Sequence, residues 1–275
     1  MTMIKKLALS IGAAAAAMAM SLSAQAATIS NANGTFGFTG FDWDANGTAF
    51  TTGFAGVGSV FTLQYFSWAT SVKNGPDNLA LAGLDSIADG IALAPFGGPA
   101  YEYTVYANLT EQVVSCVSAT ECTFAVVSGT YEIRYDTQAN ANVKTAKGTG
   151  FTDGTLIIAG SFDAQPGGSF TVTGSGGSGF TTLLGNVTYT NLDFINPALT
   201  DTVVGTTLQL GNKTTNLWTS PGGFNGVAFT GTADQIVFQA DANQSFTGAV
   251  PEPGSLALVS LALLGVGAVA RRRKS

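Results

Sequence analysis

Turn-forming residue pairs recur through the middle of this chain at intervals that suit short strands. Six Asn-Gly or Asp-Gly pairs are present, at residues 33–34, 46–47, 74–75, 89–90, 153–154 and 225–226. Such pairs accept the positive φ that tight hairpins require. The stretches between them are rich in Thr, Val, Phe and Tyr, which suit a half-buried pleated surface. We find no convincing amphipathic helix, so this region is predicted to fold as many short antiparallel strands.

Candidate strands follow one another closely along the chain. Tyr101, Tyr103 and Val105 fall on one face of their stretch, which is predicted to pair antiparallel with the next one. Residues 79–93 fit either a short helix or a loop, and the Gly-rich residues 174–179 are interpreted as a loop inside one domain. The spacing is typical of an all-β fold, either an antiparallel β-sandwich or a jelly-roll-like barrel, and the sandwich is the form preferred here. The predicted strands are residues 60–68, 101–117, 122–135, 155–162, 169–173, 185–194, 203–210 and 235–240.

The N-terminus has the three parts of a secretory signal peptide. Two lysines lie within the first six residues, and residues 7–22 form a continuous stretch rich in Ala, Leu and Met. Ala24 and Ala26 provide the small residues of a cleavage site, so cleavage before Ala27 is predicted. Residues 1–26 are therefore assigned to a signal helix that the mature protein lacks.

The C-terminus combines a short motif, an apolar stretch and a basic end. Pro251, Glu252 and Pro253 precede the apolar residues 254–270, and Arg271, Arg272, Arg273 and Lys274 follow. Seventeen residues at a rise of 1.5 Å make a helix of about 26 Å, close to the hydrocarbon thickness of a bilayer. Residues 254–270 are thus predicted to form a transmembrane helix with its basic tail, 271–274, in the cytoplasm. The preceding residues are then on the far side of the membrane.

Removing both ends leaves an exported domain, residues 27–249, and changes its charge. Five cations and sixteen acidic residues are left, a formal charge of about −11. Such a surface repels nucleic acid and anionic lipid, so neither is an expected partner. All 18 Phe, 7 Tyr and 3 Trp lie in this domain, which is far more aromatic content than a disordered chain carries.

Cys116 and Cys122 are the only cysteines, and both lie in the exported part. A closely spaced pair in an oxidising compartment indicates a disulfide across a hairpin loop. A metal site is the alternative, but two thiols in a chain without histidine make a poor zinc site. No metal and no cofactor is expected.

The absence of histidine restricts the enzymatic chemistry open to the chain. Ser-His-Asp and Cys-His triads and imidazole-ligated metals are excluded. A glycosidase with two carboxylates is the main enzyme class left. Four glutamates, Glu102, Glu111, Glu121 and Glu132, lie in the predicted hairpin, where Glu102 and Glu132 are placed to face each other. A solvated acidic face is the simpler interpretation, and we expect a non-enzymatic protein.

Two further features are candidate binding sites. Residues 42–47, Asp-Trp-Asp-Ala-Asn-Gly, match the first half of an EF-hand loop. The twelfth position is Gly53 rather than Glu, so the alternatives are a looser calcium site between Asp42 and Asn46 or a simple hairpin turn. Trp43, Trp68 and Trp218 are candidates for stacking on sugar rings if they are exposed, although each is also a candidate core residue.

The C-terminal segment as a whole resembles the PEP-CTERM sorting signal. The resemblance implies recognition by a membrane-embedded exosortase and cleavage near Pro251-Glu252-Pro253, so that the transmembrane helix is a temporary anchor. It also implies a protein exported across the inner membrane, anchored at first, and then found at the cell surface or outside the cell.

Several stretches of the exported domain are similar to the flocculation-associated PEP-CTERM proteins. The resemblance implies a non-enzymatic surface or matrix protein that helps to retain extracellular polysaccharide in flocs or biofilm. A carbohydrate-binding module with a defined groove is a second interpretation, and a histidine-free glycosidase is a third. The stretches that carry the resemblance are residues 41–44, 101–103, 109–113, 135–142, 148–157 and 238–243.

Overall fold

The computed structural model describes residues 27–91, 99–118, 121–144, 147–173, 176–199, 202–211, 220–232 and 234–247. All sixteen strands lie in one compact unit, Ala26–Gly248. The strands are β1 (Thr28–Asn31), β2 (Gly34–Gly37), β3 (Gly40–Trp43), β4 (Gly47–Thr52), β5 (Val60–Asn74), β6 (Asp77–Leu79), β7 (Glu102–Ser118), β8 (Glu121–Asp136), β9 (Thr155–Phe162), β10 (Gln165–Thr173), β11 (Gly176–Thr190), β12 (Ile195–Asn196), β13 (Val203–Gly211), β14 (Gly223–Phe224), β15 (Val227–Ala228) and β16 (Val237–Thr247).

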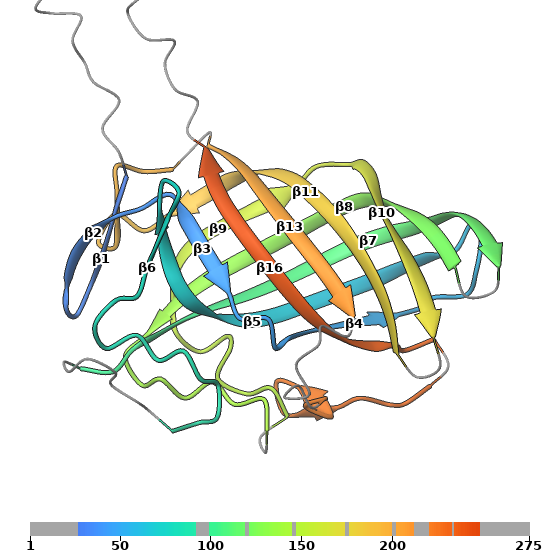
Figure 1. Ribbon diagram of the computed structural model, residues 1–275, viewed down its shortest axis with the longest axis horizontal. Coiled ribbons are helices and arrows are strands. Elements are labelled where there is room, and N and C mark those ends of the chain that lie inside the picture. Colours follow the sequence, from blue (N-terminus) through green and yellow to red (C-terminus); the bar gives the residue numbers. More distant parts are fainter. Residues whose placement is uncertain are drawn as a thin grey trace, which may run out of the picture. The chain divides into compact units, whose positions relative to one another are not determined.

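The main sheet closes on itself as a barrel with eight strand positions (Figure 1). Each position is antiparallel to its neighbours and follows the chain order: β3 with β4, then β5, β7, β8, β9 with β10, β11, β13 and β16. The last strand, β16, pairs back onto β3 and β4, which completes the ring. Closure removes the unpaired edges that an open sheet would expose.

Two of the eight positions are occupied by interrupted strands. β3 and β4 both pair with β16 and β5, and the break between them is the turn before Gly47. β9 and β10 both pair with β8 and β11, with Asp163 and Ala164 between them. Register shifts in several pairs bend the strands, as β-bulges do where a sheet must curl.

Apolar side chains fill the inside of the barrel. On β7 every second side chain faces the inner core, as Tyr103, Val105, Ala107 and Leu109 do, and from Val105 to Val113 the side chains between them are less buried. Rings from different strands contact one another there, as in the pair Phe41 of β3 and Tyr103 of β7, whose centroids are 5.3 Å apart. Eight-stranded barrels are just wide enough for side chains to fill.

A second, smaller apolar cluster, here called the outer cluster, lies on the outside of β4, β5 and β7. It contains Phe50, Phe66, Trp68, Ala88, Ala141 and Phe151. Ala88, Ala141 and Phe151 come from the connections that follow β6 and β8, and residues of the connection that follows β13 pack against the cluster, so these connections cover the outer face rather than extend into solvent. Figure 1 shows them gathered along one side of the barrel.

Most of the predicted strands are confirmed, and β9 begins and ends at the predicted residues. The predicted pairing of residues 101–117 with 122–135 is β7 with β8. Asn33-Gly34, Asn46-Gly47, Asn74-Gly75 and Asn225-Gly226 each lie at a connection between paired or consecutive strands. In residues 79–91 no helix forms, and β11 begins within the Gly-rich segment, at Gly176.

The sandwich prediction is wrong: the strands form one closed barrel rather than two facing sheets. The physical reason is the long-range pairing of β16 with β3 and β4, which converts a linear series of hairpins into a ring. The predicted signal helix, 1–26, and transmembrane helix, 254–270, lie outside the described residues. In the part of the chain that is described, we find no helix long and apolar enough to cross a membrane.

A substitution at Gly185 tests how closely the backbones of β11 and β9 approach each other. A Cβ on Gly185 would lie 2.0 Å from the carbonyl oxygen of Ser161, whereas a Cβ on Gly205, in the adjacent strand, would meet nothing within 4 Å. We expect Gly185→Ala to lower the free energy of unfolding by about 2 kcal/mol because the backbone must shift. Gly205→Ala is the matched control and is expected to change stability by less than about 0.5 kcal/mol. Equal denaturation midpoints for the two variants would contradict the register of this part of the barrel.

Candidate functional site

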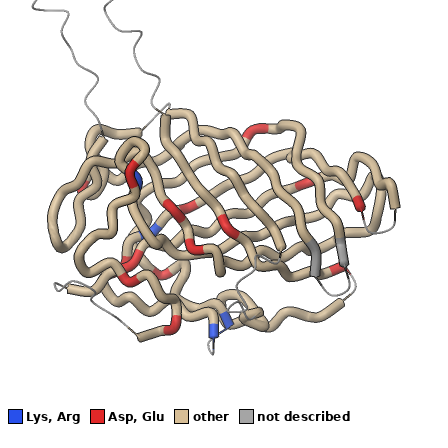
Figure 2. Tube along the Cα trace, in the orientation of Figure 1, with Lys and Arg blue, Asp and Glu red and all other residues tan. Residues whose placement is uncertain are grey.

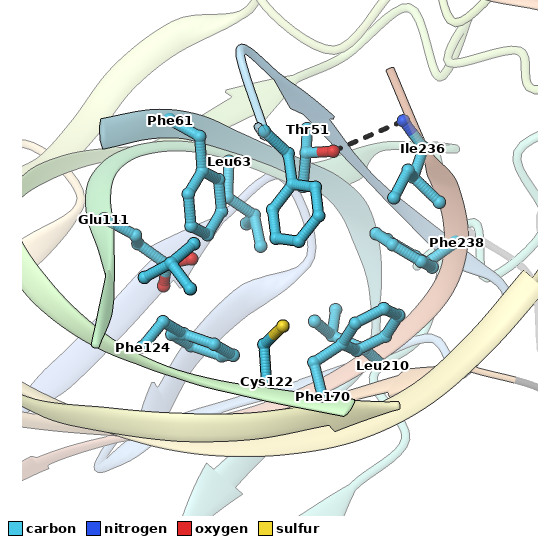
Figure 3. A pocket seen from close by; sticks show the side chains of 12 residues that line it. Thr51, Phe61, Leu63, Glu111, Cys122, Phe124, Phe170, Leu210, Ile236 and Phe238 are labelled. Carbon is cyan, nitrogen blue, oxygen red and sulfur yellow. Dashed lines mark hydrogen bonds between the residues drawn. The ribbon is translucent and has the colours of Figure 1, made fainter. Parts of the chain in front are cut away.

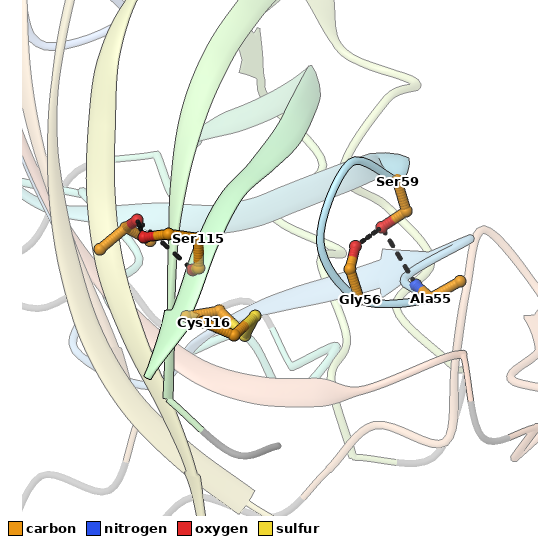
Figure 4. Close-up of a disulfide and its surroundings, with 7 residues drawn as sticks. Ala55, Gly56, Ser59, Ser115 and Cys116 are labelled. Atoms are coloured by element: carbon orange, nitrogen blue, oxygen red, sulfur yellow. Dashed lines mark hydrogen bonds between the residues drawn. A yellow bond between two sulfur atoms is a disulfide. The ribbon is translucent and has the colours of Figure 1, made fainter. Parts of the chain in front are cut away.

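The predicted disulfide between Cys116 and Cys122 is present (Figure 4). It joins β7 to β8 near the turn that connects them, and the two Cα atoms are 4.0 Å apart. Ser115 and Thr123, which are also paired across these strands, share a hydrogen bond of 2.7 Å between their hydroxyls. The residues predicted for signal cleavage and sorting lie outside the described part of the chain, except Ala27. They are Ala24, Ala26, Pro251, Glu252, Pro253 and the basic tail.

The glutamates do not form the solvated acidic face that the sequence analysis expected. Glu102 is only 2% exposed and Glu111 only 1%, whereas Glu121 is exposed and Glu132 partly so. The sequence contained a signal for Glu111, because it continues the inward alternation of β7 that runs from Tyr103 to Val113. The alternation of inward and outward side chains along β7 therefore predicts the burial of Glu111 better than the polarity of its side chain does.

Glu102 and Glu132 also do not face each other. Glu102 is opposite Asp136 and Glu132 is opposite Tyr106. The Glu132 Oε2 atom lies 2.6 Å from Nη2 of Arg134, so this carboxylate is used in an ion pair at the surface. Glu102 and Glu111 are nine positions apart on one strand, or about 30 Å, which is several times the separation of a glycosidase pair.

Glu102 attaches a loop to the barrel. Its Oε1 atom accepts hydrogen bonds from the backbone N–H groups of Asn140 and Ala141, at 2.8 and 3.0 Å. Burial raises the pKa of Glu102 to about 8, even though the two N–H donors act to lower it. The carboxyl therefore holds the connection between β8 and β9 over the outer cluster.

Trp43 and Trp68 do not provide sugar-stacking surfaces, because both are buried. Trp43 is in the inner core, and Trp68 is in the outer cluster, where its Nε1–H donates to the carbonyl of Ser86 at 2.8 Å. Trp218 lies outside the described residues. Any aromatic platform in the described chain must therefore come from other residues.

An outward-facing hollow on β4 and β5, here called the outer groove, has a suitable size and composition. Its volume is about 330 Å³, within the range of small-molecule sites. Three Phe side chains form its apolar surface, and amide and hydroxyl side chains are also present. The lining residues are Phe50, Gln64, Phe224, Asn225, Val227, Ala228, Phe229, Thr230 and Gln235.

A two-residue turn positions one wall of the outer groove. β14 and β15 form a hairpin through Asn225 and Gly226, both of which have positive φ. The Phe224 ring stacks on Tyr106 with centroids 5.0 Å apart and an interplanar angle of 12°. Phe229, beyond the hairpin, contacts Phe50 at 4.7 Å. The aromatic walls are therefore held by contacts with the barrel.

Hydrogen bonds also order the polar part of the outer groove. The Oε1 atom of Gln235 accepts from the backbone N–H of Thr230 at 2.6 Å and from its hydroxyl at 2.9 Å. Gln64 Nε2 donates to the Tyr106 hydroxyl. Aromatic faces beside oriented amides and hydroxyls are suited to a neutral polyhydroxylated ligand.

A line of polar residues, here called the polar row, continues from the outer groove around the barrel. Consecutive members are directly opposite each other on β5, β7, β8, β9 and β11, and all are at least partly exposed. Figure 2 shows that charged residues are sparse over the barrel strands. At about 4.8 Å per strand, the row is about 19 Å long. Its members are Gln64, Asn108, Thr130, Ser161 and Asn186.

The Asp42–Asn46 segment forms a hairpin turn. The Asp44 Oδ1 atom accepts from the backbone N–H of Asn46 at 2.6 Å and from its side-chain amide at 2.9 Å. Asp42 accepts from Asn78 at 3.1 Å. Among the residues that the structure describes, no three His, Cys, Asp or Glu side chains are grouped so that they could hold a metal ion. The geometry here is that of a capped turn.

Residues 249–274 match a known family model, the PEP-CTERM protein-sorting motif. The chain therefore contains a PEP-CTERM sorting motif, which implies export by way of a membrane-anchored precursor and processing by an exosortase. The match covers the sorting segment and not the barrel. No curated protein and no solved structure matches the chain.

The two buried glutamates make stability depend on pH. Burial in apolar surroundings raises the pKa of Glu111 to about 8, as for Glu102, from an ordinary value near 4.5. Between pH 4.5 and 8 the folded state therefore binds more protons than the unfolded state, so the free energy of unfolding falls as pH rises. Each group contributes a slope of at most about 1.4 kcal/mol per pH unit.

We expect Glu111→Gln to reduce this slope over the same pH range, measured by urea unfolding at several pH values. Glu121→Gln changes the same charge at an exposed position of β8 and is the control that leaves the slope unchanged. A slope equal to that of the unmodified protein in Glu111→Gln would show that Glu111 does not titrate in this range.

Proposed function

We propose that this protein is a non-enzymatic component of the bacterial surface or extracellular matrix, and that it retains exopolysaccharide in flocs or biofilm. The outer groove with its polar row is the observation that carries the polysaccharide part of the proposal. The sorting motif supports the location, because an exosortase substrate is delivered outside the inner membrane.

The chemistry of the outer surface supports a glycan as the partner. Hydroxyl and amide side chains exchange hydrogen bonds with sugar hydroxyls, and the apolar faces of sugar rings stack on aromatic rings. The outer groove offers both within one hollow, next to the exposed members of the polar row. The polar row crosses five strands, so it is better suited to an extended, chain-like ligand than to a compact ligand.

Two modes of binding are compatible with this surface. In the first, the whole polar outer face makes many weak contacts with the polysaccharide, and strength comes from the number of contacts. In the second, the outer groove binds a defined glycan, as a carbohydrate-binding module does. The stacked Phe224 and the ordered Gln235 favour the second mode, because both side chains are positioned before any ligand arrives.

A catalytic role is not part of the proposal. The buried carboxylates, Glu102 and Glu111, are on opposite faces of β7, one under a loop and one inside the barrel. Neither lines the outer groove. A glycosidase needs two carboxyl groups on either side of one scissile bond.

The sorting motif can be tested through processing. We expect Glu252→Ala to prevent cleavage, so that the uncleaved chain accumulates in the membrane fraction of the producing cells. Glu121→Ala removes a carboxylate from the barrel and serves as the control that is processed normally. The readout is the mass of the protein recovered from membrane and extracellular fractions. Normal release of Glu252→Ala would count against processing at this motif.

The outer groove can be tested by binding to the exopolysaccharide purified from the producing cells. Val227 lines the groove and is 71% exposed, so Val227→Glu places a charge there without disturbing the core. Phe229→Leu removes an aromatic face while keeping an apolar side chain. We expect each variant to bind at least about tenfold more weakly, a loss of about 1.4 kcal/mol.

Val57→Glu is the matched control for the groove variants. Val57 is 65% exposed in the connection between β4 and β5 and does not line the outer groove. It is expected to bind like the unmodified protein. If all three variants bound equally well, the outer groove would not be the binding site. A protein that bound no polysaccharide at all would overturn the proposal.

A further inference from the structure

A cavity at one end of the barrel interior, here called the Glu111 pocket, is separate from the outer groove. Residues of β4, β5, β7, β8, β10, β13 and β16 enclose it. Its volume is about 30 Å³. Figure 3 shows the Glu111 side chain directed toward the other side chains that line it. The lining residues are Thr51, Phe54, Phe61, Leu63, Glu111, Val113, Cys122, Phe124, Phe170, Leu210, Ile236 and Phe238.

The Glu111 carboxyl has no partner in this cavity. The residue is 1% exposed, and both carboxyl oxygens are buried without a hydrogen bond to any described group. A buried carboxyl without a partner costs several kcal/mol as the anion, and buried polar groups in folded proteins are normally satisfied. An unpartnered acceptor pointing into a cavity therefore indicates a site that a complementary group fills.

The walls of the Glu111 pocket favour a cation as that group. Five phenylalanine rings line the cavity that contains the carboxyl, and the faces of aromatic rings attract organic cations. No Lys or Arg lines the cavity, so no side chain there supplies the positive charge. Glu111 is also the only lining residue that titrates, because Cys122 is held in the disulfide. The rings are those of Phe54, Phe61, Phe124, Phe170 and Phe238.

We propose that the Glu111 pocket binds a small primary ammonium ion, with the N–H groups donating to the Glu111 carboxylate and the short carbon chain against the phenylalanine rings. This charge-assisted hydrogen bond would satisfy the carboxyl oxygens that the protein leaves unpaired. The site is independent of the proposed polysaccharide function, because it lies inside the barrel and shares no lining residue with the outer groove.

The rim of the pocket sets the size of the ligand. Phe54, Phe170 and Ile236 are only partly buried and form its outer boundary. The Phe54 ring packs edge-on against Phe61, with centroids 5.7 Å apart, and so narrows the opening. The enclosed space is enough for about two water-sized groups. This space matches the ammonium group and the first carbon of an alkylammonium. A chain of two or three carbons extends into the opening, and longer chains require Phe54 to move.

The test is a titration of the purified full-length protein with n-propylamine, followed by the shift in thermal unfolding midpoint, with 1-propanol and propionate as matched ligands. We expect propylamine alone to raise the midpoint, with half-saturation in the millimolar range. Because the cation binds the ionised carboxyl and burial raises the pKa of Glu111 to about 8, affinity is expected to fall about tenfold from pH 7 to pH 6.

Three variants make the test decisive. Glu111→Gln is expected to weaken propylamine binding at least tenfold and to abolish its pH dependence, whereas Glu121→Gln, at an exposed position, is expected to change neither. Phe54→Ala is expected to admit hexylamine, which the unmodified protein excludes. Equal midpoint shifts with propylamine and propanol would overturn the proposal in favour of simple apolar filling. The absence of any shift with propylamine at 100 mM, or an unchanged response in Glu111→Gln, would also overturn it.

Discussion

The pairing of β16 with β3 and β4 is the interaction on which the rest of the structure depends. It joins the last strand to the first, so that every strand position in the ring has two antiparallel neighbours. Without it the sheet would expose two unpaired edges and the apolar side chains of its inner face. With it, one face of every strand is directed into a common interior. The outer face is then free to carry loops, the outer cluster and a polar surface.

The closed interior also explains why buried polar groups concentrate there. Once the ring is formed, every inward position of a strand is buried, whatever its side chain. Glu111 occupies such a position on β7 and the Tyr131 hydroxyl occupies another on β8, both without a described hydrogen-bond partner. Retaining such groups in a core of this size costs stability, which is the physical reason for assigning a ligand to Glu111, the one that can carry a charge near neutral pH.

The sequence predicted the elements well and their assembly poorly. Strand stretches and Asn-Gly turns are local patterns, and most of them lie where expected, as β9 and the 225–226 turn show. The prediction offered a hairpin turn at residues 42–47 but named no strands on either side of it, so β3 and β4, the partners that β16 needs to close the barrel, were missed. Closure joins residues 187 to 205 positions apart, and no local pattern reports such a pairing.

For the site, the sequence predicted the disulfide and the sorting segment but not the groove. Trp43 and Trp68 attracted attention by residue type, yet burial removes them from any surface role. Phe224 and Phe229 gave only a weak indication of a binding site, because the sequence shows no more than two aromatic residues on either side of the predicted Asn225-Gly226 turn. Their function as walls depends on the contacts with Tyr106 and Phe50, which only the folded barrel brings together.

The central claim is that an exported barrel presents one preformed outer groove to a polysaccharide. The most direct measurement is the mapping of NMR chemical-shift changes on the protein during titration with oligosaccharides cut from the matrix of the producing cells. The account predicts the largest changes at Gln64, Asn225, Thr230 and Gln235, with smaller changes along the polar row. Changes that are absent, or that centre on another face of the barrel, would contradict it.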